Sequence, residues 1–161
     1  MSSNQSIILG IGNEILKDDG IGPQLVKDLQ QHEPIGNVEY KTAFLGGLDL
    51  LDLIRDYRIV ILVDAIKTRN GIPGTVSYFT PENFTETLHL SNFHDASFLN
   101  TLHLGKQLGI PLPDEIHIIA IEIVEDMVFG NSFSPEIASK MDVIYQEVNQ
   151  LIKDILVPPS Q

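Results

Sequence analysis

The sequence predicts an α/β fold: one domain over residues 1–161, built as a three-layer sandwich. We expect a mostly parallel twisted sheet with an antiparallel edge strand and helices on both faces. Two observations support this prediction. Short apolar runs of strand length alternate with segments whose apolar residues recur at helical spacing. The strand-like runs are apolar at successive positions, as in strands that are buried on both faces.

The first half of the chain contains three predicted strands and two predicted helices. In order, they are a strand at 6–11, a helix at about 20–32, a strand at 37–44, a helix from Leu48 to Ile54 after a Gly46-Gly47 turn, and a strand at 59–63. The last of these is the clearest strand, because five aliphatic residues in a row run directly into Asp64.

The second half predicts an edge strand at 75–79, a helix at 95–108 that ends near Gly109, and a strand at 116–123. The segment 67–74 before the edge strand is too short for a helical crossover, so that strand should be antiparallel. Ser134-Pro135-Glu136 has a hydroxyl cap and a proline in the first turn, which predicts the start of one long terminal helix.

Composition excludes several classes of protein. There are no cysteines, so disulfides, zinc–thiolate sites and cysteine nucleophiles are excluded. The net charge of −12 without a basic stripe argues against nucleic-acid binding. No apolar run approaches the roughly 18 residues that cross a bilayer, and the first residues do not form a signal peptide. We therefore expect a cytoplasmic protein that does not bind membranes.

Ligands of open parallel sheets bind beyond the carboxyl ends of the strands, near the point where the strand order reverses. Three polar features are predicted at that edge: the pair Asp18 and Asp19 after the first strand, Asp64 after the central strand, and His94 at the start of a helix. The position of Asp64 after a buried strand favours a functional role over a turn or cap residue.

The glycine loop Gly10-Ile11-Gly12 is a weak nucleotide-binding signal. A third glycine of the dinucleotide fingerprint would fall at Ile15, and no acidic residue closes the second predicted strand. A tight turn after the first strand is the better interpretation.

Asp18 and Asp19 precede the first helix, where one carboxylate suffices as a cap. We assign Asp18 to capping and leave Asp19 open between a cap and a cation ligand, since adjacent like charges favour a positive neighbour. Of the five histidines, only His94 begins a helix at the predicted edge; the others are His32, His89, His103 and His117.

Two carboxylates and one imidazole, from Asp19, Asp64 and His94, would form an open site for a borderline divalent ion such as zinc or nickel. Calcium and magnesium do not favour an imidazole ligand. These three residues are therefore the candidate metal ligands and catalytic groups.

Four motifs occur in order along most of the chain. They are Gly10–Asn13 followed by Asp18–Gly22, Val63-Asp64-Ala65 at the end of the central strand, His94-Asp95 before a helix, and Ser134-Pro135-Glu136 at the start of the last helix. Together they make the sequence similar to the hydrogenase maturation protease family.

This resemblance implies an endopeptidase that removes the C-terminal extension of a nickel–iron hydrogenase large-subunit precursor after nickel insertion. It implies that Asp19, Asp64 and His94 coordinate the metal. The nickel would be presented by the substrate, with zinc or cadmium as surrogates. Separately from the resemblance, we expect the protein to act as a monomer. Cleavage could use a metal-polarised carbonyl, an activated water, or an aspartate as general base.

Two positions depart from the family pattern. Asp19 stands where glutamate is frequent, and it remains a competent ligand. Leu45 stands where the family often has Asp or Asn associated with substrate selection, so the identity of the substrate is left open.

Two alternatives remain at this point. A phosphoacceptor receiver-type signalling domain would bind magnesium through Asp18, Asp19 and Asp64, but the last predicted parallel strand lacks the lysine that receivers need. A non-catalytic nucleotide-binding module would need the missing third glycine.

Overall fold

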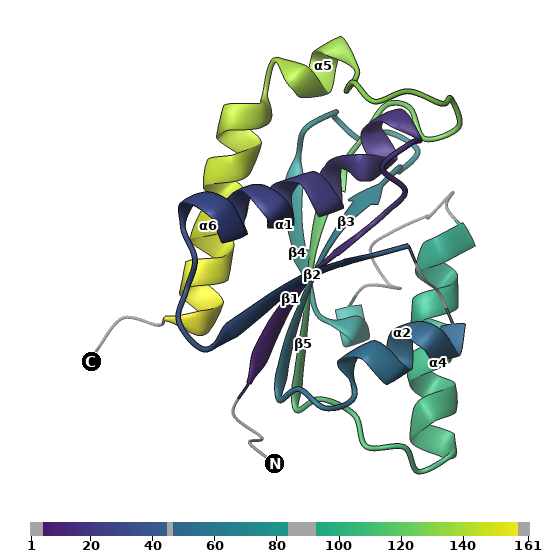
Figure 1. Cartoon of the computed structure of the whole chain (residues 1–161). Helices are drawn as coiled ribbons and strands as arrows, with labels where there is room; N and C mark the ends of the chain where they lie inside the picture. Colours follow the sequence, from purple (N-terminus) through teal and green to yellow (C-terminus); the bar gives the residue numbers. More distant parts are fainter. Residues whose placement is uncertain (1–4, 45–46, 84–92, 158–161) are drawn as a thin grey trace.

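The computed structural model of the chain describes residues 5–44, 47–83 and 93–157 (Figure 1). Leu45, His89, Ser91 and Asn92 lie outside these ranges. The elements are β1 (Ser6–Ile11), η1 (Lys17–Gly20), α1 (Ile21–His32), β2 (Val38–Ala43), α2 (Gly47–Ile54), β3 (Ile59–Ile66), β4 (Val76–Phe79), α4 (Phe93–Gln107), β5 (Glu115–Glu122), α5 (Pro135–Ala138) and α6 (Met141–Leu156).

The predicted fold class is confirmed. One five-stranded sheet has the order β2-β1-β3-β5-β4, in which β4 alone of its strands is antiparallel. Within the described ranges, no helix is long and apolar enough to cross a bilayer.

Helices cover both faces of the sheet, and the alternation of side chains along each strand supplies both cores (Figure 1). On β3, Ile59, Ile61 and Val63 pack with α1, α5 and α6. Val60 and Leu62 point the other way and pack with α2 and α4. The central strand is therefore buried on both faces, as its continuous apolar sequence predicts.

The strand order reverses between β1 and β3. The chain leaves β1 through α1 to reach β2 on one side, then returns through α2 to β3 on the other side. At the carboxyl end of this pair, Ile11 of β1 stands beside Asp64 of β3. Asp64 thus lies at the topological switch point, where open α/β sheets bind ligands.

Close backbone packing at this edge requires glycine. A Cβ on Gly22, in the first turn of α1, would lie 2.3 Å from the carbonyl oxygen of Val63 and 2.7 Å from that of Ile11. A Cβ on Gly10 would lie 2.6 Å from the carbonyl oxygen of Gly22. The start of α1 therefore rests directly on the ends of β1 and β3, which explains the glycines without a nucleotide.

The prediction of one long terminal helix is wrong. The segment forms two helices, α5 and α6, separated at Ser139 and Lys140. The Ser139 hydroxyl donates to the carbonyl oxygen of Glu136, and Lys140 Nζ donates to the carbonyl oxygen of Pro73 at 2.6 Å. Both bonds favour a change of direction that the apolar spacing of the segment does not reveal.

Replacing Gly22 with alanine tests the close packing at the start of α1. The added Cβ would meet two backbone carbonyl oxygens that cannot rotate away, so Gly22→Ala should lower the free energy of unfolding by about 3 kcal/mol. The matched control is Gly36→Ala, because nothing lies within 4 Å of a Cβ there. Chemical denaturation of the two variants measures the difference; equal stability would contradict the packing argument.

Candidate functional site

Asp64 lies inside β3 and not in the loop after it, because the strand continues to Ile66. Its side chain alternates with Ala65 and shares a face with Val60 and Leu62, so it is directed to the side covered by α2 and α4. The backbone N–H of Ala65 donates to Asp64 Oδ1 at 2.8 Å. The interpretation of Asp64 as a turn residue is therefore wrong, and its side chain faces the layer that contains α4.

Asp19 lies in the short helix η1 and is buried. The backbone N–H of Asn13 donates to Asp19 Oδ2 at 2.8 Å, so the glycine loop fixes this carboxylate directly. Gly12, with a φ of +151°, makes the approach possible, because a Cβ there would lie 2.0 Å from the carbonyl oxygen of Asp19. The glycine motif and the acidic motif thus form one local unit.

Asp18 does not cap a helix, which corrects the assignment made from the sequence. The helix α1 has Gly20 at its N-cap position and no side-chain cap hydrogen bond. Asp18 is instead 0% exposed and accepts hydrogen bonds from the far end of the chain. Its donors are the backbone N–H groups of Val124 (3.1 Å), Glu125 (2.9 Å) and Ser134 (2.7 Å) and the Ser134 hydroxyl (2.7 Å).

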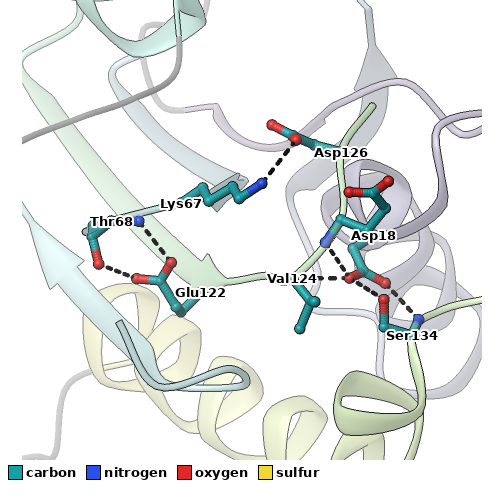
Figure 2. A network of polar contacts seen from close by, with 8 residues as sticks. Asp18, Lys67, Thr68, Glu122, Val124, Asp126 and Ser134 are labelled. Carbon is teal, nitrogen blue, oxygen red and sulfur yellow. Dashed lines mark hydrogen bonds and ion pairs between the residues drawn. The ribbon is translucent and has the colours of Figure 1, made fainter. Parts of the chain in front are cut away.

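Ser134 is therefore also not the hydroxyl cap that its sequence context predicts. It occupies the N-cap position of α5 without a capping hydrogen bond, and its hydroxyl donates to Asp18 (Figure 2). Proline follows it at the first helical position, as predicted. The Asp18 carboxylate thus connects η1 to both ends of the segment between β5 and α5.

A second buried carboxylate, Glu122 at the end of β5, fixes the segment after β3 (Figure 2). Its Oε2 accepts from the backbone N–H of Thr68 at 2.8 Å, and its Oε1 accepts from the Thr68 hydroxyl. Lys67 forms an ion pair with Asp126 at 3.6 Å. No local pattern around Glu122 predicts this contact, because Thr68 is 54 residues away.

His94 is the second residue of α4, and only its backbone is among the described features. The helix begins at the carboxyl edge of the sheet, since it ends before β5 starts at the opposite edge (Figure 1). The backbone of His94 is therefore at the same edge as Asp64, and α4 covers the face to which Asp64 is directed. The geometry of its imidazole lies outside the described part of the structure.

The other described histidines lie away from this edge. His32 ends α1, and His103 is in the middle of α4, where its Nε2 is 3.2 Å from Gln107 Nε2. His117 on β5 lies between two partners, with Nδ1 2.6 Å from the Tyr78 hydroxyl and Nε2 2.9 Å from Glu115 Oε2. It is a satisfied structural residue, one of the interpretations that its place in a strand allowed.

In the described part of the chain, one cavity lies at each end of the sheet among those with the best-defined walls. A cavity of about 830 Å³ lies between α4 and the start of β5, and Leu102, His103, Lys106 and His117 are among its lining residues. A smaller cavity of about 320 Å³ lies beside the glycine loop and is lined by residues that include Asn13, Ile15 and Phe44. The smaller one borders the candidate site, since the backbone of Asn13 binds Asp19. Volume alone therefore does not identify the functional end of the molecule.

Asp19 and Asp64 are thus brought to one edge of the sheet, and each has one oxygen fixed by a backbone N–H. Among the described side chains, no three histidine or acidic residues form a metal-binding group. The imidazole of His94 is not one of those side chains, so the three-residue metal site remains a prediction. Carboxylates and an imidazole at this edge have the chemistry of an open zinc or nickel site.

Residues 23–151 match the family model described as "Hydrogenase maturation protease". A curated relative, the hydrogenase expression/formation protein HupD of Thiocapsa roseopersicina, is 28% identical over 144 residues. That match covers 87% of this chain but 64% of HupD, so the chain spans less than two thirds of the relative's length.

Solved structures share the fold over nearly the whole chain. The hydrogenase maturating endopeptidase HybD from Escherichia coli superposes with a TM-score of 0.75 at 20% identity and covers 94% of each chain. The [NiFe] hydrogenase maturation protease HybD from Thermococcus kodakarensis gives a TM-score of 0.65 at 24% identity and covers 91% of this chain and 98% of its own.

The receiver-domain alternative is not favoured. Both oxygens of Asp18 already accept hydrogen bonds in a site without solvent exposure, so Asp18 is not available as a magnesium ligand. The match with the family model described as "Hydrogenase maturation protease" also favours a protease over a receiver domain.

Asp18→Asn tests the anchoring role of the buried carboxylate. The amide would present N–H groups to a backbone N–H and would lose charge-assisted bonds, so the free energy of unfolding should fall by about 3 kcal/mol. The same change at the exposed Asp114, in the loop before β5, is the control and should alter stability by less than about 0.5 kcal/mol. Urea denaturation followed by circular dichroism provides the measurement, and similar midpoints for both variants would refute the anchor.

Proposed function

The chain belongs to the hydrogenase maturation protease family, and on that basis we propose that it is an endopeptidase that acts on a nickel–iron hydrogenase large-subunit precursor. In this proposal it removes the C-terminal extension of the precursor after nickel has been inserted. The observation that supports a catalytic centre most directly is the position of Asp64 beside β1, at the reversal of strand order. Asp19 is fixed at the same edge through Asn13.

The proposed metal ligands are Asp19, Asp64 and His94, and the metal is the nickel of the substrate. Two carboxylates and an imidazole leave coordination positions open for the ligands that the precursor contributes. The nickel would therefore join the substrate to the protease and signal that the precursor is ready for cleavage. Zinc or cadmium should substitute for nickel at the same side chains.

The chain's own groups define what this site can do. The N–H groups of Asn13 and Ala65 each fix one carboxylate oxygen, which limits rotation of Asp19 and Asp64 before the substrate arrives. A fixed carboxylate can orient an attacking water and take its proton as a general base. Metal bound beside the scissile peptide would supply Lewis-acid polarisation of the carbonyl. All proposed ligands come from one chain, so the proposal requires only a monomer, acting in the cytoplasm.

Cleavage of purified precursor tests the activity. Nickel-loaded precursor should be shortened by the wild-type protein, and nickel-free precursor should remain intact. Asp19→Asn, Asp64→Asn and His94→Ala should each reduce the rate by about a hundredfold or more, because each removes a proposed ligand or base. His103→Ala, on the same helix as His94, is the control and should cleave at the wild-type rate. Wild-type rates in all three site variants would refute the assignment.

Direct metal binding gives a readout independent of activity. Zinc or cadmium titrated into the protein by calorimetry should bind at one site, and the heat should be lost in Asp64→Asn and in His94→Ala but retained in His103→Ala. Crystals soaked with cadmium should show the ion at Asp19, Asp64 and His94. Density away from all three side chains would refute the metal site and leave the fold unaffected.

A further inference from the structure

Among the described residues, five large apolar side chains are exposed on the loops after β1, β2 and β5, at the carboxyl edge of the sheet and beside the candidate site. Their exposed fractions are 58% for Ile15, 61% for Phe44, 78% for Met127, 48% for Val128 and 75% for Phe129. We call this set the apolar rim. Exposed apolar surface of this density on a folded domain commonly marks an interaction site.

The rim is continuous across three segments of the chain. Ile15 and Phe44 line the same cavity of about 320 Å³. The carbonyl oxygen of Ile15 accepts from the N–H of Gly130 at 2.9 Å, and Lys17 N–H donates back to the carbonyl oxygen of Gly130 at 3.1 Å. These bonds bring Met127–Phe129 next to Ile15, so the five side chains belong to one surface.

The rim is also attached to the turn that contains Asp19. Asp18 binds the segment at Val124, Glu125 and Ser134, on both sides of Met127–Phe129. Lys67, which follows β3, pairs with Asp126 just before it. On the other side, Asn13 lines the cavity while its N–H binds Asp19. A partner seated on the rim would therefore contact the same structural unit that presents the candidate ligand.

The charges beside the rim favour an apolar partner segment. Lys27 pairs with Glu14 beside the cavity, and Lys67 pairs with Asp126 next to Met127. These two ion pairs reduce the net charge that the surface beside the rim presents to a partner. The rim itself presents the aliphatic, thioether and aromatic surface of its five side chains.

The size of the rim distinguishes between a second copy of the chain and a transient partner. Five such side chains at these exposures present roughly 600 Å². A permanent homodimer interface buries about 1,000–2,500 Å² on each partner, and about 65% of that area is apolar. It would therefore need roughly 650–1,600 Å² of apolar surface, which is more than the rim presents. The rim therefore fits a substrate that binds, reacts and leaves better than it fits a permanent dimer.

We propose that the apolar rim is the docking surface for an apolar segment of the substrate protein, and that the rim holds this segment while the scissile peptide reaches Asp19 and Asp64. The inference rests on the proposed function, because the occupant is the hydrogenase precursor. The inference goes beyond the proposed function, because it assigns part of the affinity for the precursor to the five side chains of the apolar rim, which bind no metal. Asp18 then acts as a positioning residue that holds the segment Met127–Phe129 at a fixed place relative to Asp19.

The double variant Met127→Ser/Phe129→Ser tests the proposal in the precursor-cleavage assay. KM for nickel-loaded precursor should rise about tenfold or more while kcat stays near wild type, because docking contacts are removed and the reacting groups are retained. The control is Leu108→Ser, which is 62% exposed and follows α4 at the opposite end of the sheet. It should leave both constants unchanged, and all variants should melt at the wild-type temperature.

The outcomes separate the two proposals. If the wild type cleaves the precursor but the double variant has an unchanged KM, the docking surface is refuted and the protease function stands. If the wild type fails to cleave nickel-loaded precursor, the function is refuted and the docking inference falls with it. If light scattering shows a wild-type dimer that the double variant abolishes, the occupant is a second copy of this chain and the inference is overturned.

Discussion

The buried carboxylate of Asp18 joins two parts of the chain that are 116 residues apart. Without exposure to solvent, a carboxylate is stable only when its oxygens are satisfied, and here backbone N–H groups and one hydroxyl satisfy them. The segment between β5 and α5 has no regular structure of its own, so it takes its shape from this acceptor. Because Asp19 is the next residue, the same interaction sets the backbone position of a proposed ligand.

Close backbone contact supplies the second constraint. The first turn of α1 rests on the carbonyl oxygens of Ile11 and Val63, at the point where β1 and β3 end together. Only glycine at position 22 permits that distance. The glycine loop then returns the N–H of Asn13 to the Asp19 carboxylate. The Gly10–Gly12 loop resembles part of a nucleotide-binding motif, but here it holds η1, which contains Asp18 and Asp19, near the end of β3.

At this edge of the sheet, the residues proposed for cleavage differ from those proposed for substrate docking, but the same contacts of η1 hold both sets in place. Asp64 lies at the reversal of strand order, and Asp19 is fixed at the same edge. The side chains of the apolar rim are on the loops after β1, β2 and β5. An acidic chain of net charge −12 could attract many basic proteins, so charge alone would give little selectivity. An apolar contact that acts together with a substrate-borne metal would require two independent features of the correct partner.

The sequence by itself determined the parallel sheet, the central strand and the place of Asp64 at its carboxyl edge, because these depend on local apolar periodicity and on strand order rules. That β3 continues past Asp64 to Ile66 was not predicted. It also indicated the family, through motifs whose spacing is local.

Only the tertiary structure decided what Asp18 and Ser134 do. Each has the sequence pattern of a helix cap, but the two side chains bind each other across the domain. A hydrogen bond to a buried partner is stronger than one to an exposed helix end, because the interior has a low dielectric constant. The terminal segment divides into α5 and α6 where Ser139 binds Glu136 and Lys140 binds Pro73, and its continuous apolar stripe does not reveal these contacts. Likewise, Met127–Phe129 has no periodicity, and its place beside the site depends on tertiary contacts, among them the bonds of Gly130 with Ile15 and Lys17.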